Sequence, residues 1–379
     1  MNQNKKFDSQ ADEWKEYKLG DLFEFKNGVN ADKGSYGKGV KFINISEVLK
    51  YNSLTADRIP GQVHIDKDKI SLYKVKRGDI LFNRTSEVAE EIAMASVYMD
   101  DEEVVFGGFV IRGRNTTKLI NENFSKYLFS SKKFRKQAIS KAQGAVRANI
   151  GQENLGNIVI DLPPIKEQEK IAEILSTWDE AIGLLENKVD FFSKKKKKYL
   201  GDLYKSEGDL RRISDICNIV YGKSPKEVIN ENGKNFVWGT GGVSGKSDAI
   251  NFTAPVILLG RKGTINKPIL ITEDCWIIDT AYGVKSKQID VDLNWLYYLF
   301  CSIDLMKFNE SSGVPSLGRD NLYSHKVYVP DLKKQKNIGA LLSSVDKELK
   351  LLKQKIKLVS QQKHGLAQQL LTGKRRVKV

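Results

Sequence analysis

Residues 158–175 read IVIDLPPIKEQEKIAEIL, and residues 325–342 read HKVYVPDLKKQKNIGALL. Both stretches pass from a β-rich run through proline into a charged sequence that favours a helix. Proline suits the first turn of a helix, where its missing N–H is not needed. We therefore predict that one long helix starts after Pro164 and a second after Pro330, in two copies of one plan.

The apolar pattern that follows each proline is that of a coiled coil. In both copies apolar residues alternate in steps of four and three, which are the a and d positions of a heptad. Each residue of the second copy lies 167 positions after its counterpart. We interpret this as a duplication whose two helices pair, and the pair can be antiparallel. The predicted seam is Ile171, Leu175, Trp178, Ile182, Leu185 and Val189 in the first copy, and Ile338, Leu342, Val345, Leu349, Leu352 and Ile356 in the second.

A lysine interrupts the seam at the same place in both copies, at Lys196 and at Lys363. A polar residue at a seam position can fix the register of a coiled coil, at a cost in stability. The sequence leaves two interpretations open at this point. Either the two helices fray here, or the lysine forms a polar notch that helps to set the register.

The segments before the helices also repeat. EYKLGDLFEFKNG (16–28) is echoed by LRRISDICNIVYG (210–222), and RGDILFNRT (77–85) is echoed by APVILLGRK (254–262). In each copy, short β-rich runs with glycine turns alternate with one clear helix. We predict an α+β fold in which two similar domains are separated by two long antiparallel coiled-coil helices, related by an internal pseudo-two-fold repeat. The expected segments are a flexible tail (1–13), a domain (14–162), a helix (163–205), a domain that opens on a short linker (206–330), a helix (331–373) and a frayed basic tail (374–379).

The charge is distributed unevenly along the chain. The formal net charge is +15, and the part from Asp331 onward has 13 basic and 3 acidic residues. A basic excess of this size favours a polyanionic partner such as nucleic acid. The alternative is a lysine-rich helix whose charged face is simply solvated.

Other features of the composition exclude several classes of protein. Three cysteines are too few for a disulfide framework, which favours the reducing cytoplasm. No apolar run approaches the length of a membrane span, so we expect no membrane association. The three histidines and three cysteines lack ligand spacing, so we predict no metal site.

Two stretches resemble enzyme motifs but fail in detail. WGTGGVSGKS (238–247) would be a phosphate-binding loop only if Thr240 were glycine. DLPPI (161–165) resembles the Asp-Pro-Pro-aromatic motif of adenine methyltransferases, but its polar residue is out of register and the aromatic residue is missing. We therefore predict no catalytic residue in this chain and no cofactor bound by it.

Candidate nucleic-acid contacts lie at matching places in the two domains. Arg84 and Arg261 each follow an apolar strand, and arginine is favoured for phosphate and guanine. The alternative is a strand-end arginine paired with a carboxylate. Small, polar and basic residues also precede each long helix, where a packing turn is the alternative. The predicted DNA-binding residues are Lys41, Asn83, Arg84, Thr85, Arg147, Asn149, Thr240, Lys246, Arg261, Lys262, Ser316 and Arg319.

From about Trp14 to Gly373 the chain resembles the specificity subunits of type I restriction-modification systems. Four motifs carry the resemblance through their order and duplication, although the second copy has PDLKKQ where the first has PPIKEQ. The motifs are PPIKEQEKI (163–171), GRKGTI (260–265), SGVPSL (312–317) and QQLLTG (368–373).

The resemblance implies a non-catalytic DNA-recognition subunit. Two target-recognition domains would each read one half of a bipartite site in double-stranded DNA. The helices would be spacers that set the gap and dock two modification subunits, with restriction subunits joining the complex. S-adenosylmethionine, ATP and magnesium would be bound by those partners. Two alternatives remain: a coiled-coil assembly protein whose globules bind proteins, and a stand-alone enzyme that modifies nucleic acid.

Overall fold

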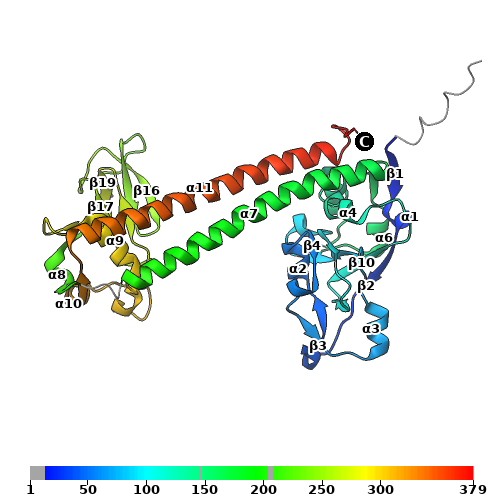
Figure 1. Cartoon of the computed structure of the whole chain (residues 1–379), viewed down its shortest axis with the longest axis horizontal. Helices are drawn as coiled ribbons and strands as arrows, with labels where there is room; N and C mark the ends of the chain where they lie inside the picture. Colours follow the sequence, from blue (N-terminus) through cyan, green and yellow to red (C-terminus); the bar gives the residue numbers. More distant parts are fainter. Residues whose placement is uncertain (1–12, 145–146, 204–207, 379) are drawn as a thin grey trace, which may run out of the picture. The chain divides into compact units, whose positions relative to one another are not determined.

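The protein is described here by a computed structural model, and its chain divides into two units. Each unit holds one globule together with parts of both long helices (Figure 1). The first unit comprises residues 1–183 and 357–379, and the second comprises 184–356. The structure describes residues 13–144, 147–203 and 208–378. Nearly all of the expected flexible tail (1–12), and the junction between first helix and second domain (204–207), lie outside the described residues.

The first globule is built on a five-stranded sheet whose central strand is buried on both faces. Ile80 and Phe82 of that strand pack into one hydrophobic cluster with Phe124, whereas Leu81 packs into another with Phe106. This alternation explains why the strand reads as a continuous apolar run. In sheet order the strands are β2 (Phe23–Asn27), β10 (Val110–Asn115), β6 (Ile80–Asn83), β8 (Ala95–Tyr98) and β4 (Ser53–Leu54).

Smaller sheets and short helices complete the first globule. In the three-stranded sheet, β3 pairs antiparallel with β5 and parallel with β9. Strands β1 and β12 pair antiparallel, so the beginning and end of the globule are joined. The strands are β3 (Tyr36–Ile43), β5 (Gln62–Val63), β9 (Val104–Phe106), β7 (Thr85–Ser86), β11 (Ala148–Asn149), β1 (Lys15–Lys18) and β12 (Val159–Leu162). The α-helices are α1 (Leu19–Leu22), α2 (Ile45–Lys50), α3 (Lys67–Tyr73), α4 (Glu122–Leu128), α5 (Lys132–Ser140) and α6 (Gln152–Gly156).

The second globule repeats this plan with fewer residues. Its central strand is again buried throughout, with Ile257 and Leu259 in one cluster and Val256 and Leu258 in another. The main sheet has the order β14 (Cys217–Tyr221), β20 (Ala281–Ser286), β17 (Val256–Gly260) and β18 (Ile269–Ile271). The other strands are β15 (Asn235–Gly239), β16 (Gly242–Ser247), β19 (Cys275–Ile277), β13 (Asp209–Arg212) and β21 (Lys326–Val329), and the helices are α8 (Ile213–Ile216), α9 (Leu293–Ser302) and α10 (Arg319–Ser324).

The order of paired strands confirms the predicted repeat. β14, β20 and β17 take the places of β2, β10 and β6, and β13 pairs with β21 as β1 pairs with β12. The three-stranded sheet also recurs, because β15 pairs antiparallel with β16 and parallel with β19. The two globules therefore share one topology, and the first differs mainly by added segments such as β4.

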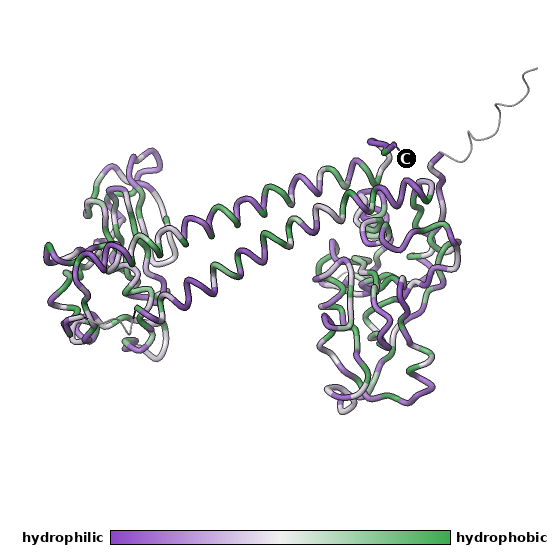
Figure 2. Tube along the Cα trace, viewed as in Figure 1, coloured by the Kyte–Doolittle hydropathy of each residue, from purple (hydrophilic) through white to green (hydrophobic). Residues whose placement is uncertain are grey.

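The two long helices, α7 (Ile165–Leu203) and α11 (Leu332–Leu370), have 39 residues each, which is roughly 58 Å of helix. In the first unit, the start of α7 and the end of α11 pack into the same hydrophobic cluster as the globule. In the second unit, the end of α7 and the start of α11 do so. The predicted antiparallel pair is thereby confirmed. Figure 2 shows hydrophobic and hydrophilic residues alternating along both helices, as amphipathic helices require.

The predicted seam residues all lie on the less exposed side of their helices. Ile171, Leu175, Leu342, Val345 and Leu352 are buried, and the remaining seven are partly buried. Ile171 and Leu175 belong to the core of the first globule, and Leu342 belongs to the core of the second. The start of each seam therefore also anchors a globule to its own helix.

A buried glutamine fixes the start of α7 to the first globule. Gln168 is 0% exposed, and its Oε1 accepts a hydrogen bond from the backbone N–H of Asn121 at 2.9 Å. Its Nε2 donates to the carbonyl oxygens of Leu119 and Pro163, both at 2.8 Å. Asn121 is also the residue whose side chain caps α4. One amide therefore joins the entry of α7 to the entry of α4.

Gln335 repeats this arrangement 167 residues later. It is also 0% exposed, and its Oε1 accepts from the backbone N–H of Asp292 at 2.8 Å. Its Nε2 donates to the carbonyl oxygens of Asp290 at 3.0 Å and Pro330 at 2.7 Å. Asp292 caps α9. Each long helix is thus attached to its own globule by the same three hydrogen bonds.

The lysines that interrupt the seam are paired in the structure. In the first unit, Lys363 of α11 bonds to Asp179 of α7, and the hydroxyl of Tyr127 in α4 donates to Asp179 at 2.7 Å. The Lys363 ammonium also lies 5.3 Å from the centre of the Tyr127 ring. Burial raises the pKa of Tyr127, so its hydroxyl stays protonated and can donate. This joint connects both long helices to one globule.

The second unit contains the same joint with the helices exchanged. Lys196 of α7 bonds to Asp346 of α11, and the hydroxyl of Tyr298 in α9 donates to Asp346 at 3.0 Å. Burial raises the pKa of Tyr298 as well. The two interpretations left open by the sequence are therefore resolved, because each lysine forms a polar notch and the helices continue through it.

The expectation of a frayed basic tail is wrong for Arg376 and Val377. Arg376 donates to both carboxylate oxygens of Glu167, at 2.8 Å from Nε to Oε1 and 2.8 Å from Nη2 to Oε2. The Glu167 side chain is only 2% exposed and also accepts from the indole N–H of Trp14. Val377 packs against the core of the first globule. A buried carboxylate therefore holds the tail, because leaving that charge unpaired would be costly.

Candidate nucleic-acid interface

In both globules, the loop after the buried central strand pairs with the loop that precedes α6 or α10. In the first globule, Thr85 faces Asn149 in the ladder of β7 and β11, and the N–H of Ile150 donates to the carbonyl of Arg84 at 3.0 Å. Arg147 and Asn149 are exposed at this place. The structure thus brings four of the predicted contacts into one loop pair. Residues 145 and 146 of the predicted loop lie outside the described residues.

The second globule forms the same loop pair. Lys262 faces Ser316 in an isolated bridge, and the N–H of Leu317 donates to the carbonyl of Arg261 at 2.8 Å. Asn149 and Ser316 are again 167 positions apart. The pairing of these loops is therefore a duplicated feature of the fold, and it gathers the predicted residues at equivalent places.

The two strand-end arginines donate to main-chain carbonyls. Nη1 of Arg84 donates to Gly108 at 3.3 Å, and Nη1 of Arg261 donates to Asp279 at 3.0 Å. Both side chains are partly exposed. Each arginine therefore donates to a carbonyl, whereas the alternative left open by the sequence requires a carboxylate.

A stack of aromatic and cationic side chains borders the loop pair of the second globule. The guanidinium carbons of Arg261 and Arg319 lie 5.1 Å and 5.0 Å from the ring centre of Tyr221. Tyr221 is 44% exposed and packs edge-on against the buried ring of Tyr282. Burial raises the pKa of Tyr282 to about 12, so this phenol is neutral at physiological pH. Stacked arginine and exposed aromatic rings are common in nucleic-acid interfaces.

The loop pair of the first globule has a different lining. Arg147 forms an exposed ion pair with Glu87 at 3.0 Å, and such pairs are weak and easily exchanged for another anion. Phe109 is 59% exposed beside them. A hollow of about 440 Å³ is bordered by Ile45, Leu49, Thr85, Val88, Phe109 and Arg147, among others.

The remaining predicted contacts of the second globule lie close to the loop pair or on a neighbouring strand. Thr240 lies beside Gly263, since a Cβ added to Gly263 would be 3.7 Å from the Thr240 hydroxyl. Lys246 is exposed on β16. Thr240 therefore belongs with Lys262, and Lys246 extends the basic surface along the small sheet.

Two predicted contacts of the first globule have partners within the protein. Asn83 is 0% exposed, donates to the carbonyl of Glu91 at 2.8 Å and accepts from the N–H of Thr85 at 3.2 Å. The prediction that Asn83 contacts DNA is therefore wrong, because both ends of its amide shape the turn. Lys41 donates to the carbonyl of Ala56 at 2.7 Å and forms an ion pair with Glu102 at 3.4 Å.

The three cysteines have raised thiol pKa values. Burial raises the pKa of Cys217 to about 12 and the pKa values of Cys275 and Cys301 to about 11. These thiols are protonated at neutral pH, and the thiolate is the reactive form. All three cysteines are therefore held in the less reactive, protonated form.

The described ranges contain neither a cluster of metal ligands nor a membrane-spanning helix. Residues 13–144, 147–203 and 208–378 contain no group of three or more His, Cys, Asp or Glu side chains arranged to hold a metal ion. None of the helices in the described part of the chain is long and apolar enough to cross a membrane.

One family model covers most of the chain. Residues 11–190 and 205–361 match the type I restriction modification DNA specificity domain, so the model matches twice, once for each globule with its helix. The chain belongs to this family. The resemblance found in the sequence is thereby confirmed, and with it the expected role as a DNA specificity subunit rather than an enzyme.

Known specificity subunits align with most of the chain. The putative type I restriction enzyme MjaX specificity subunit of Methanocaldococcus jannaschii is 25% identical, over 97% of this chain and 95% of the relative. The MjaVIII specificity subunit of the same organism is also 25% identical, over 66% of this chain and 70% of the relative.

Two solved structures have the same fold. The S subunit of a type I restriction-modification system from M. genitalium has a TM-score of 0.63, with 17% identity over 97% of this chain and 98% of that one. A chain from a study of complex assembly and conformational transition of the type I R-M system has a TM-score of 0.59, with 13% identity over 94% and 97%.

Some important residues of this specificity-family chain were not singled out from its sequence. Gln168 and Gln335 stand inside the quoted motifs, and Asp179 and Asp346 stand in the helices, but none was given a role. All four obey the 167-residue spacing. Comparison of the two copies position by position, polar residues included, would have marked them. Tyr221 had no such signal, because its counterpart in the first globule is not aromatic.

Proposed function

We propose that the chain is the DNA-specificity subunit of a type I restriction-modification complex, in which each globule reads one half of a bipartite site in double-stranded DNA. The observation that carries the proposal is the duplicated loop pair, Thr85 with Asn149 and Lys262 with Ser316. Two equivalent surfaces of polar and basic residues suit two half-sites. Phosphate contacts would position each globule, and contacts to base edges would supply the sequence choice.

The residues proposed to contact DNA are those that the structure leaves accessible at the loop pairs. Arg84, Arg261 and Lys41 would each exchange a present carbonyl partner on binding DNA. In the first globule the accessible contacts are Thr85, Arg147 and Asn149. In the second they are Thr240, Lys246, Arg261, Lys262, Ser316 and Arg319.

We further propose that the long helices dock two modification subunits. Leu184 and Phe191 of α7 are 65% and 60% exposed, and Leu351 and Leu358 of α11 are 51% and 60% exposed. The second pair lies 167 positions after the first, outside the seam. Large apolar residues exposed at matched positions of a duplicated helix suit two copies of the same partner.

The partners would supply all the chemistry of the complex. Modification subunits would bind S-adenosylmethionine and methylate the DNA, and restriction subunits would use ATP and magnesium. The raised pKa values of the three cysteines, two of which are buried, agree with this division of roles. A cytoplasmic location fits a DNA partner of this kind.

An exchange of one globule tests the proposal. Residues 14–162 are replaced by the equivalent domain of another specificity subunit, and methylated sites are then mapped by sequencing in cells that carry the whole system. We expect one half of the recognised site to change, while the other half and the gap persist. A change in both halves would contradict the assignment of one globule to one half-site.

A binding measurement on the assembled complex tests the loop pairs themselves. Lys262→Ala should lower the slope of log affinity against log salt by about one unit, as expected for one lost phosphate contact. Lys353→Ala removes the same charge from an exposed position on α11, and it serves as the matched control. Equal effects of the two variants would contradict a DNA contact by the loop pair.

A further inference from the structure

In the second globule, the guanidinium of Arg319 is held between two tyrosine rings. The Arg319 guanidinium carbon lies 5.0 Å from the ring centre of Tyr221 and 5.8 Å from that of Tyr323. Tyr323 is itself fixed, because its hydroxyl accepts from the backbone N–H of Ile219 at 2.7 Å. Tyr221 rests against buried Tyr282. Stacking against two anchored rings limits the rotation of the guanidinium before any ligand arrives.

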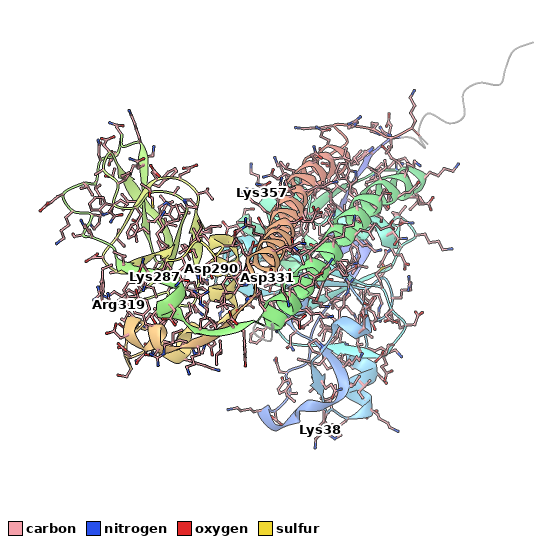
Figure 3. All side chains as sticks on the ribbon, turned by 60° about the vertical axis from the view of Figure 1, so that its left-hand side comes forward. Lys38, Lys287, Asp290, Arg319, Asp331 and Lys357 are labelled. Atoms are coloured by element: carbon pink, nitrogen blue, oxygen red, sulfur yellow. The ribbon has the colours of Figure 1, made fainter. Side chains whose placement is uncertain are left out.

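The donors at the end of Arg319 are available. Its described hydrogen bond runs from Nε to the neighbouring Asp320 at 3.3 Å, and the structure gives no partner to Nη1 or Nη2 within the described ranges. Its side chain is 32% exposed, at the edge of the second globule (Figure 3). Arg261, on the same Tyr221 ring, instead uses Nη1 on the carbonyl of Asp279. Of the two stacked arginines, Arg319 therefore has more N–H donors available to a ligand. Its two terminal nitrogens, Nη1 and Nη2, form a fork of parallel donors.

At the equivalent position of the first globule, the side chain is already hydrogen-bonded within the protein. Gln152 lies 167 residues before Arg319, and it begins α6 as Arg319 begins α10. With its amide oriented to suit its neighbours, Gln152 donates to the carbonyl of Phe25 and accepts from the N–H of Asn27, both at 3.1 Å. Its hydrogen-bonding groups are therefore used by β2. The two globules differ at one matched position beside their loop pairs.

We propose that Arg319 reads a guanine in the half-site bound by the second globule, an inference that rests on the proposed function. Two parallel N–H donors match the O6 and N7 acceptors of guanine in the major groove, and no other base presents that pair. A pre-oriented fork loses little conformational freedom on binding. Gln152 of the first globule makes no such contact, so this readout is expected in one half-site only.

The test uses the complete modification complex and four variants, of which Tyr221→Leu removes the ring beneath the guanidinium. Arg319→Gln removes the charge and the fork, and Arg319→Lys keeps the charge but removes the fork. Arg211→Gln is the matched control, because Arg211 lies in the same globule but is held by Asp290 at 2.8 Å. Methylated sites are mapped for each variant, and binding to duplexes with each base at every half-site position is measured at several salt concentrations.

If Arg319 reads a guanine, the wild-type complex and the variants should differ in base preference in a specific way. In the wild-type complex, the half-site that survives exchange of residues 14–162 should contain a guanine. Arg319→Gln and Arg319→Lys should each reduce the preference for that guanine by about 5- to 150-fold. The other half-site should stay unchanged, and Arg211→Gln should leave both unchanged. Tyr221→Leu should weaken binding while the guanine stays preferred, because the ring positions the fork but does not read the base.

Other outcomes would overturn the inference. A surviving half-site without guanine would do so directly. Uniform weakening on all sequences by Arg319→Gln, with a salt slope lower by about one, would identify a phosphate contact instead. Neither result bears on the bipartite site itself. Failure of the proposed function would show separately, in a wild-type site without two halves or in an exchange of 14–162 that alters both.

Discussion

Gln168 and Gln335 each satisfy three backbone groups that would otherwise be buried without partners. The amide oxygen accepts from one backbone N–H, and the amide NH₂ donates to two backbone carbonyl oxygens. A buried polar group left unsatisfied costs about 1–3 kcal/mol, so each glutamine has a large effect for a single uncharged residue.

We predict that Gln168→Ala and Gln335→Ala each lower the free energy of unfolding by on the order of 3 kcal/mol. Denaturant unfolding of the purified chain measures this change. Gln361→Ala, at an exposed position of α11, is the control and should change stability by less than about 0.5 kcal/mol. If the buried and exposed substitutions had equal effects, the glutamines would not be holding the helix entries.

Residues whose role follows from nearby sequence were predictable, and residues with distant partners were not. The seam and the proline entries could be predicted because heptad spacing and proline geometry are local properties. Gln168 could not, since its partner Asn121 lies 47 positions away. Asn83 was misassigned for a related reason. It ends an apolar strand as a DNA-facing residue would, but the turn folds its side chain inward onto Glu91.

At the scale of the elements, an apolar seam alone does not define one register. Its pattern returns every seven residues, so a shift of α11 by one heptad still matches apolar residues. Facing positions of an antiparallel pair have residue numbers with a constant sum, and that sum is 542 for both lysine bridges. After a shift of seven, Lys196 would face Lys353 or Gly339. The lysine joints therefore exclude registers that the apolar seam permits.

We predict that Lys363→Glu destabilises the purified chain by about 1–2 kcal/mol, because it sets a second carboxylate against partly buried Asp179. Adding Asp179→Lys restores opposite charges and should recover at least half of the loss, as seen by denaturant unfolding. Lys357→Glu makes the same charge change at an exposed position of α11 and should have a smaller effect. Additive losses in the double variant would show that the two side chains are not coupled.

At the scale of the whole molecule, the two joints define where helix length can be changed without loss of register. Lengthening α7 after Glu186 and α11 after Lys353 places both insertions between the joints, at positions 167 residues apart. Equal insertions raise the sum of facing residue numbers by the same amount at both bridges. Lys196 can then still meet Asp346, and Lys363 can still meet Asp179. The length of the paired helices changes while both ends keep their contacts.

If the paired helices set the distance between the two reading surfaces, four added residues per helix should lengthen the unread gap in the DNA. Four residues add about 6 Å of helix, and a base pair rises about 3.4 Å, so the gap should grow by one or two base pairs. The stutter should be absorbed by local unwinding. Some affinity should be lost, because helix and DNA rotate by different amounts and the duplex must be twisted.

Seven added residues keep the heptad phase and should add about three base pairs. Sequencing of methylated sites should return the same half-sites with these longer gaps, whereas an unchanged gap with retained methylation would show that the helices do not measure the DNA.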